Sequence, residues 1–340
     1  MNTVLRYYAY HFKRTLIRII VLVIFISLMA YYSSCSNWYS PEYAYVEFTA
    51  TTVVLIIIAY LLAAMELYPF KNRRNLDLWL SSPLSRTKLI VTHIVNGAVH
   101  LFITTLFAGI FATARIAVMN TMLTRFNTIS GLRYAAVIFP SLLITYIVAC
   151  AIYIIGNNGT DGVIFLIMYT LLPVLVNGAI EYFSYNFRID TDFQSLAYLS
   201  WLELPLALTV DEERIAMNKP AIMINSGRDM AALVVSSVVW GLIAVALLVL
   251  IAVYFRKLKP EKIGGPSDIF PGYRFLIPSC GYSMLILSAD SYIVVPLFIL
   301  IGMFLMYIVF RKGIRIKIPD IVCLGVGVVI MILMRVIAPL

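Results

Sequence analysis

Four polar side chains recur along an otherwise apolar stretch, in a pattern that could support chemistry. They are His93, Asn96, His100 and Thr104, with Gly97 beside them. On a helix, the spacings of three, four and four residues place all four on one face, as a polar stripe two to three turns long. Polar residues in membrane helices usually face protein or a cavity. The stripe therefore predicts hydrogen bonding between helices or, alternatively, part of a substrate path or proton relay.

The rest of the sequence contains no recognisable catalytic motif. It has no HExxH, no serine-nucleophile elbow and no Walker A sequence, and the Gly-rich run at 156–162 lacks the lysine of a phosphate loop. The four cysteines are scattered, and two histidines seven residues apart lack a third ligand. We therefore expect no metal site, no cofactor and no enzymatic activity in this chain.

The composition is that of a membrane protein. Of the 340 residues, 62% are hydrophobic and 13% are charged, whereas about 45–50% of a soluble domain is apolar. A net charge of +9 would suggest nucleic-acid binding in a soluble protein. Here the basic residues cluster at the ends of apolar runs, which is typical of membrane topology. The sequence predicts an all-α polytopic membrane protein.

Apolar runs of membrane-helix length predict six spans in the first three quarters of the chain. They lie at about 16–33, 46–68, 89–111, 134–155, 163–183 and 229–254. Residues 1–15 combine aromatic and basic side chains, which predicts an interfacial amphipathic helix on the cytoplasmic side. The long polar segment 184–228 is expected to be an extracytoplasmic loop.

The C-terminal quarter predicts a transmembrane extension. Residues 255–274 are basic and then rich in Gly and Pro, as in a cytosolic linker, and apolar runs follow within 275–340. The first run, 275–288, is short for a span. If it crosses, the basic residues at 311–317 lie inside, so the positive-inside rule favours nine spans in the cell membrane with a cytoplasmic N-terminus.

The polar stretch between the second and third spans has the pattern of a short amphipathic helix. Leu76, Trp79, Leu80 and Pro83 share one helical face. Such a face predicts either an interfacial helix that rests on lipid or a docking helix that fits a groove on a cytosolic partner. Ser82 followed by Pro83 predicts the start of the next helix.

Residues 66–89 also resemble the first cytosolic loop of ATP-binding-cassette (ABC) type-2 permeases. The resemblance rests on Glu66, the following basic residues, the Leu-Asp pair at 76–77 and the run SPLSRTKL at 82–89. It implies a six-span permease core over 16–254, whose loop at 69–88 carries a coupling helix that contacts a separate ATPase. The residues implied in coupling are Glu66, Lys71, Arg74, Leu76, Asp77, Trp79, Leu80, Pro83 and Arg86.

The resemblance gives Glu66 a specific expected partner. It implies that Glu66 pairs with Lys71, with Arg74 or with a basic residue of the ATPase. Without the resemblance, Glu66 is an ordinary charge at a helix end that reaches water.

By this resemblance, the chain is expected to be the permease subunit of an ATP-driven exporter of a peptide, lipid or drug-like substrate. ATP and Mg would be bound by the partner ATPase. The other expected partners are a second permease copy or paralogue and the bilayer, but not nucleic acid. Two alternatives remain: an ion-coupled secondary transporter with His93 and His100 as proton carriers, and a non-transporting sensor or resistance subunit.

Overall fold

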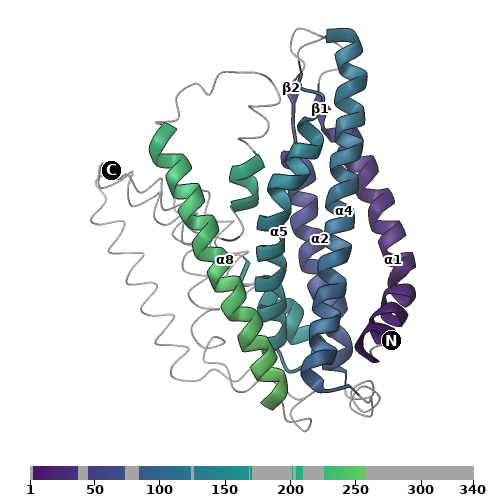
Figure 1. Ribbon diagram of the computed structural model, residues 1–340, viewed down its shortest axis with the longest axis vertical. Coiled ribbons are helices and arrows are strands. Elements are labelled where there is room, and N and C mark those ends of the chain that lie inside the picture. The colour runs from purple at the N-terminus through teal and green to yellow at the C-terminus, as the bar shows by residue number, and fades with distance from the viewer. Residues whose placement is uncertain are drawn as a thin grey trace, which may run out of the picture. The chain divides into compact units, whose positions relative to one another are not determined.

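The computed structural model describes residues 3–36, 45–72, 84–123, 126–167, 169–170, 201, 204–209 and 226–257 (Figure 1). Within these ranges, five helices are long and apolar enough to cross a membrane. They are α1 (Thr3–Ser33), α2 (Thr49–Leu67), α4 (Arg86–Leu123), α5 (Ser130–Ile155) and α8 (Ser226–Lys257). A 3-10 turn, η2 (Tyr68–Lys71), extends α2, and two-residue strands β1 (Cys35–Ser36) and β2 (Tyr45–Val46) pair antiparallel.

The all-helical character expected from the sequence is thus confirmed, with five helices long and apolar enough to cross a membrane, and the six-plus-three arrangement stays a prediction. The segments 171–200, 210–225 and 258–340 lie outside the described residues, and with them most of the predicted outer loop, linker and C-terminal extension.

Two compact units divide the chain. The first comprises Met1–Ile155 with Tyr198–Ile263 and contains all five long helices. The second comprises Gly156–Ala197 with Gly264–Leu340. In its described part a helix begins after Asn158, whose side-chain oxygen accepts a hydrogen bond from the Asp161 backbone N–H at 2.6 Å. Asn158, which lies in a Gly-rich sequence, therefore acts as the N-cap of this helix.

α1, α2 and α4 alternate in direction within the first unit (Figure 1). Near its end, α2 contributes Glu66, which contacts His11 in the first half of α1 and His93 in the first turns of α4. At the other end of the pair, the Ser33 and Thr51 hydroxyls lie 2.8 Å apart, joining the end of α1 to the start of α2. We refer to the end where α1 and α4 begin as the N-terminal end of the bundle.

α5 and α8 both finish at this N-terminal end. The Lys71 ammonium, just after α2, donates to the carbonyl of Ile154 at the end of α5, with 2.5 Å between the two atoms. The rings of Phe70 and Phe255, the latter near the end of α8, meet edge to face with centroids 5.4 Å apart. The loop between α2 and α4 therefore lies at the same end as the N-terminus.

α1 is one continuous helix across the predicted boundary between an interfacial helix at 1–15 and a span from residue 16, and where along it the membrane begins stays a prediction. Residues 3–33 contain no Pro or Gly that would end a helix. His11 and Thr15, which lie within the predicted interfacial segment, find partners inside the bundle. The apolar residues Ile17, Val21 and Ile24 are exposed on the outer face, where lipid can cover them.

α4 extends well beyond the span predicted at about 89–111, because the helix continues to Leu123. Its 38 residues make it roughly 57 Å long at 1.5 Å per residue, well beyond the apolar thickness of a bilayer. Arg115, in this added length, is only 1% exposed, and its guanidinium lies 5.3 Å from the centre of the Tyr31 ring. Packing against α1 thus shields this cation.

α4 and α5 approach one another closely at two glycines. A Cβ atom at Gly109 would lie 2.6 Å from the Cβ of Ala135 and 2.7 Å from the carbonyl oxygen of Gly131. Only the absence of a side chain permits this approach, as at other small-residue contacts between membrane helices.

Candidate functional site

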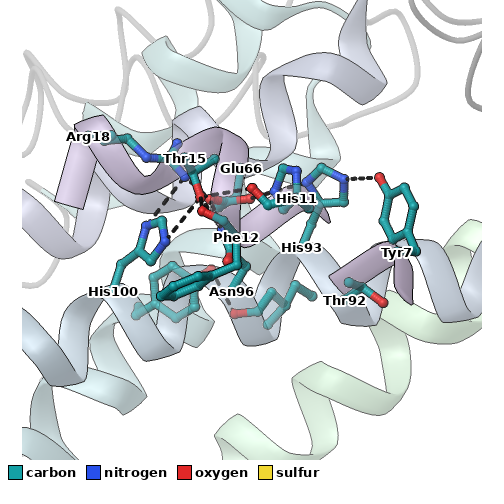
Figure 2. A network of polar contacts seen from close by, with 12 residues as sticks. Tyr7, His11, Phe12, Thr15, Arg18, Glu66, Thr92, His93, Asn96 and His100 are labelled. Carbon is teal, nitrogen blue, oxygen red and sulfur yellow. Dashed lines mark hydrogen bonds and ion pairs between the residues drawn. The ribbon is translucent and has the colours of Figure 1, made fainter. Parts of the chain in front are cut away.

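Glu66 is the centre of a buried polar network formed by α1, α2 and α4 (Figure 2). The residue is 1% exposed and lies one residue before the end of α2. A carboxylate deprived of water is stable only when other groups supply hydrogen bonds or opposite charge. Four side chains from two other helices do so, namely His11, Arg18, His93 and Asn96.

The two carboxylate oxygens have different neighbours. Oε2 accepts from His11 Nε2 at 2.9 Å and from His93 Nδ1 at 3.1 Å. Oε1 accepts from Asn96 Nδ2 at 2.9 Å and forms an ion pair with the Arg18 guanidinium. One oxygen thus faces two imidazole rings, while the other is held by a cation and an amide.

α1 supplies one side of the network through a single helical face. Tyr7, His11, Thr15 and Arg18 follow one another at spacings of four, four and three residues, which brings them to the same side of the helix. The Tyr7 hydroxyl lies 3.1 Å from His93 Nε2. Because His93 Nδ1–H donates to Glu66, its Nε2 accepts from Tyr7.

His100 extends the network deeper along α4. Arg18 donates to His100 Nδ1 at 3.4 Å, so the ring proton lies on Nε2, which donates to Thr15 Oγ1 at 3.2 Å. The same Thr15 oxygen accepts from Asn96 Nδ2 at 3.2 Å, and its own proton goes to the backbone carbonyls of His11 or Phe12. Arg18 and Thr15 therefore link both parts of the network.

Aromatic rings and a glycine shape the surroundings of the network. Phe70 meets His93 edge to face at 4.9 Å between ring centroids, and Phe12 meets His100 at 5.8 Å. A Cβ atom at Gly97 would lie 2.1 Å from the Tyr146 hydroxyl oxygen and 3.1 Å from Glu66 Cγ. The apolar rings exclude water, which strengthens the polar contacts that they enclose.

The predicted polar stripe on α4 is partly assembled into this site. His93, Asn96 and His100 are fully buried and join the network. Thr104 is fully buried too, but its hydroxyl donates within its own helix, to the carbonyls of His100 and Leu101. Three of the four stripe residues therefore form hydrogen bonds between helices, which is one of the two interpretations of the stripe. The substrate path or proton relay stays a prediction.

The expected environment of Glu66 needs correction. It neither reaches water nor pairs with Lys71, because it is buried against Arg18 and the histidines, and the Lys71 ammonium bonds a backbone carbonyl of α5. Arg86 is the first residue of α4. The other predicted coupling residues lie outside the described residues; they are Arg74, Leu76, Asp77, Trp79, Leu80 and Pro83.

Sequence reasoning did not find the α1 residues of the network. The chain has only three histidines, and all three lie here. The usable signal was the spacing of His11, Thr15 and Arg18 on one face of an uninterrupted apolar helix. The predicted boundary after residue 15 placed His11 and Arg18 in different segments, so their shared helical face was not recognised.

The network includes one set of groups with the chemistry of a metal site. His11, Glu66 and His93 each offer a ligand atom, and these atoms lie within 4.8 Å of one another. Only one of the two α4 histidines, His93, belongs to this set, and the other two ligands come from α1 and α2.

No known protein family, curated protein or solved structure matches this chain.

Proposed function

We propose that this chain is the membrane-spanning permease subunit of an ATP-driven ABC exporter, which moves a peptide, lipid or drug-like substrate out of the cytoplasm with a separate ATPase. The observation that carries the proposal is the loop from Glu66 to Leu89, whose sequence resembles the coupling loop of type-2 permeases. A second copy or a similar permease would complete the substrate path.

The geometry at the two ends of this loop supports the proposal. Glu66 precedes the loop and His93 follows it, and their side chains are bonded to one another. Arg18 and His11 then connect both to α1. A partner that pulled or pushed on the loop would therefore act on three membrane helices together through the buried network.

The charge distribution supports a cytoplasmic location for this end. Most basic residues of the long helices lie near the N-terminal end of the bundle, at Arg6, Lys13, Arg14, Arg86, Lys88, Arg256 and Lys257. Arg115, Arg133 and Arg228 lie toward the opposite end. By the positive-inside rule, the N-terminal end faces the cytoplasm, where an ATPase could reach the loop.

Co-purification of an ATPase tests the proposal. The double variant Trp79→Ala, Leu80→Ala removes two apolar groups of the predicted docking face, including the largest, Trp79. At the centre of an interface, loss of such an aromatic anchor costs roughly 2–4 kcal/mol, which is about 30- to 1000-fold in affinity. The expected result is loss of an ATP-hydrolysing subunit, identified by mass spectrometry, from the purified complex.

A matched double variant controls for general effects on the membrane helices. Ile57→Ala, Leu61→Ala removes two apolar side chains from the exposed face of α2, where they are 52% and 48% exposed, and should retain the ATPase. Full retention of the ATPase by the Trp79, Leu80 variant, at normal expression and insertion, would instead support a helix that only rests on lipid.

An ion-coupled transporter is the second candidate, and the buried network is the observation that favours it. Ionisable residues inside membrane helices often mark ion or proton paths. In proteoliposomes without ATP, this function predicts substrate uptake driven by an imposed proton gradient. ATP-dependent transport that persists without a gradient would favour the exporter.

A further inference from the structure

We propose that His11, Glu66 and His93 form a binding site for one divalent transition-metal ion of the Zn²⁺ class. Each ligand comes from a different helix, α1, α2 and α4 respectively (Figure 2). The inference does not depend on whether the chain works with an ATPase.

The positions of the three ligand atoms suit a small ion. His11 Nε2 and His93 Nδ1 lie 2.9 and 3.1 Å from the same oxygen, Glu66 Oε2. In a tetrahedral Zn²⁺ site with bonds of about 2.0–2.2 Å, neighbouring ligand atoms are roughly 3.3–3.5 Å apart. The two imidazole rings already lie side by side, with centroids 4.0 Å apart. The two nitrogens are within 4.8 Å of each other, so a rotation of the imidazole rings that closes this gap by about 1 Å, with smaller shifts away from Oε2, would admit the ion.

The residues around the ligands match the support that metal sites require. A metal-bound histidine usually donates its other N–H to a neighbouring group. With Nδ1 bound to metal, the His93 proton lies on Nε2, which faces the Tyr7 hydroxyl at 3.1 Å. Asn96 and Arg18 hold Glu66 through Oε1 and leave Oε2 for the ion. Ligating carboxylates are commonly held in this way.

The donor set selects the kind of ion. Two imidazoles and one carboxylate suit Zn²⁺, Co²⁺ or Ni²⁺, whereas Mg²⁺ and Ca²⁺ prefer an all-oxygen set. Three protein ligands leave a fourth position open. Since Glu66 carries one negative charge and Arg18 one positive charge, a divalent ion leaves the site positive. The fourth position is therefore open to water or to an anion such as hydroxide or chloride.

The site also has a route of entry. The His11 side chain is 10% exposed and that of Arg18 is 20% exposed, while those of Glu66 and His93 are fully buried. An ion would arrive past α1 and then hold that helix to α2 and α4.

Metal titration of the full-length chain tests the site. The protein is purified in detergent with a tag that contains no histidine, and Zn²⁺ is titrated against a chromophoric chelator. We expect one ion per chain. His11→Gln keeps a side-chain N–H that can donate to Glu66 and so preserves the fold, but removes a ligand. Because loss of an outer-shell partner alone costs about 10–100-fold in affinity, loss of a ligand should cost about 100-fold or more.

His100→Gln is the matched control, because His100 belongs to the same buried network but does not bond Glu66. Because it removes no ligand, it should weaken Zn²⁺ binding far less than His11→Gln does. Tyr7→Phe, which removes only the outer partner of His93, should weaken binding about tenfold. Co²⁺ bound to the wild-type chain should give the intense visible absorption of four-coordinate cobalt.

Three results would overturn the proposal. They are the absence of stoichiometric Zn²⁺ binding by the wild-type chain, equal affinity in folded His11→Gln, and equal loss in His100→Gln. If His11→Gln does not fold, Tyr7→Phe and the Co²⁺ spectrum decide: unchanged affinity together with a six-coordinate spectrum would also overturn it.

Discussion

Two sets of helices in the same bundle are held together in different ways. At the N-terminal end, α1, α2 and α4 meet through a carboxylate, a guanidinium, an amide and imidazole rings centred on Glu66. Further along α4, the contact with α5 is made by two glycines, Gly109 and Gly131, and not by charged groups. A cluster of hydroxyls then joins the start of α2 to α5.

The difference indicates which contact can change during function. Lipid gives no hydrophobic drive for helix association, so helices must attract each other by close packing or by polar bonds. Two helices that pack closely at glycines fit together in only one arrangement. A network of charges and imidazoles has several, since its protons, partners and bound ions can change. We infer that α4 and α5 form the fixed part of the unit and that the α1–α2–α4 contact is the adjustable part.

The largest effect is expected from removing the central charge. Glu66→Ala leaves the Arg18 cation with no carboxylate in a largely buried site, and breaking one partner of a buried ion pair costs roughly 3–5 kcal/mol. The free energy of unfolding in mixed micelles, followed by loss of helical circular dichroism, measures it.

Two variants sharpen this prediction. Glu47→Ala removes a carboxylate that has no ion pair within the described residues and should change stability much less. Glu66→Leu combined with Arg18→Met removes both charges, and apolar replacement of a buried pair is often neutral or stabilising. If this double variant is as unstable as Glu66→Ala, the unpaired Arg18 charge is not the cause of the lost stability.

The sequence predicted the α4 part of the site better than the α1 part. The spacing of His93, Asn96 and His100 is local, so helical periodicity alone brings them to one face. The pairing of Glu66 with Arg18 joins residues 48 positions apart and depends on how α1 packs against α2. The nearer basic residue, Lys71, was the natural candidate by sequence, but it points to α5 instead. The sequence thus predicts which segments are helical and which residues share a face. Which side chains pair between helices depends on how the helices pack.

An intermediate effect is expected at the glycine contact. Gly109→Ala places a methyl group 2.6 Å from the Cβ of Ala135 and 2.7 Å from a backbone oxygen, neither of which can rotate away. Overpacking of this kind costs typically 1–3 kcal/mol. Gly241→Ala in α8 is the control, because its Cβ would meet nothing within 4 Å, and it should be neutral or stabilise the helix by up to about 1 kcal/mol. Equal stability of the two variants would contradict a fixed α4–α5 contact.

The smallest effect is expected in the hydroxyl cluster. The Thr52 hydroxyl oxygen lies 2.8 Å from that of Tyr134 and 2.7 Å from that of Thr209, in a buried site. Tyr134→Phe removes one hydroxyl and keeps the ring that stacks on Phe48 at 4.4 Å. Polar bonds between membrane helices average about 0.6 kcal/mol in double-mutant cycles, because the unfolded chain in the membrane also finds partners.

A double-mutant cycle of Tyr134→Phe with Thr52→Val isolates that contact from the loss of packing. The coupling energy should be about 0.6 kcal/mol and should stay below the effect of Gly109→Ala. Because no charge is involved, salt should leave it unchanged. A coupling of about 3 kcal/mol would mean that neutral hydroxyls join helices as strongly as the charged network. The adjustable and fixed parts of the bundle could then not be told apart by the chemistry of their contacts.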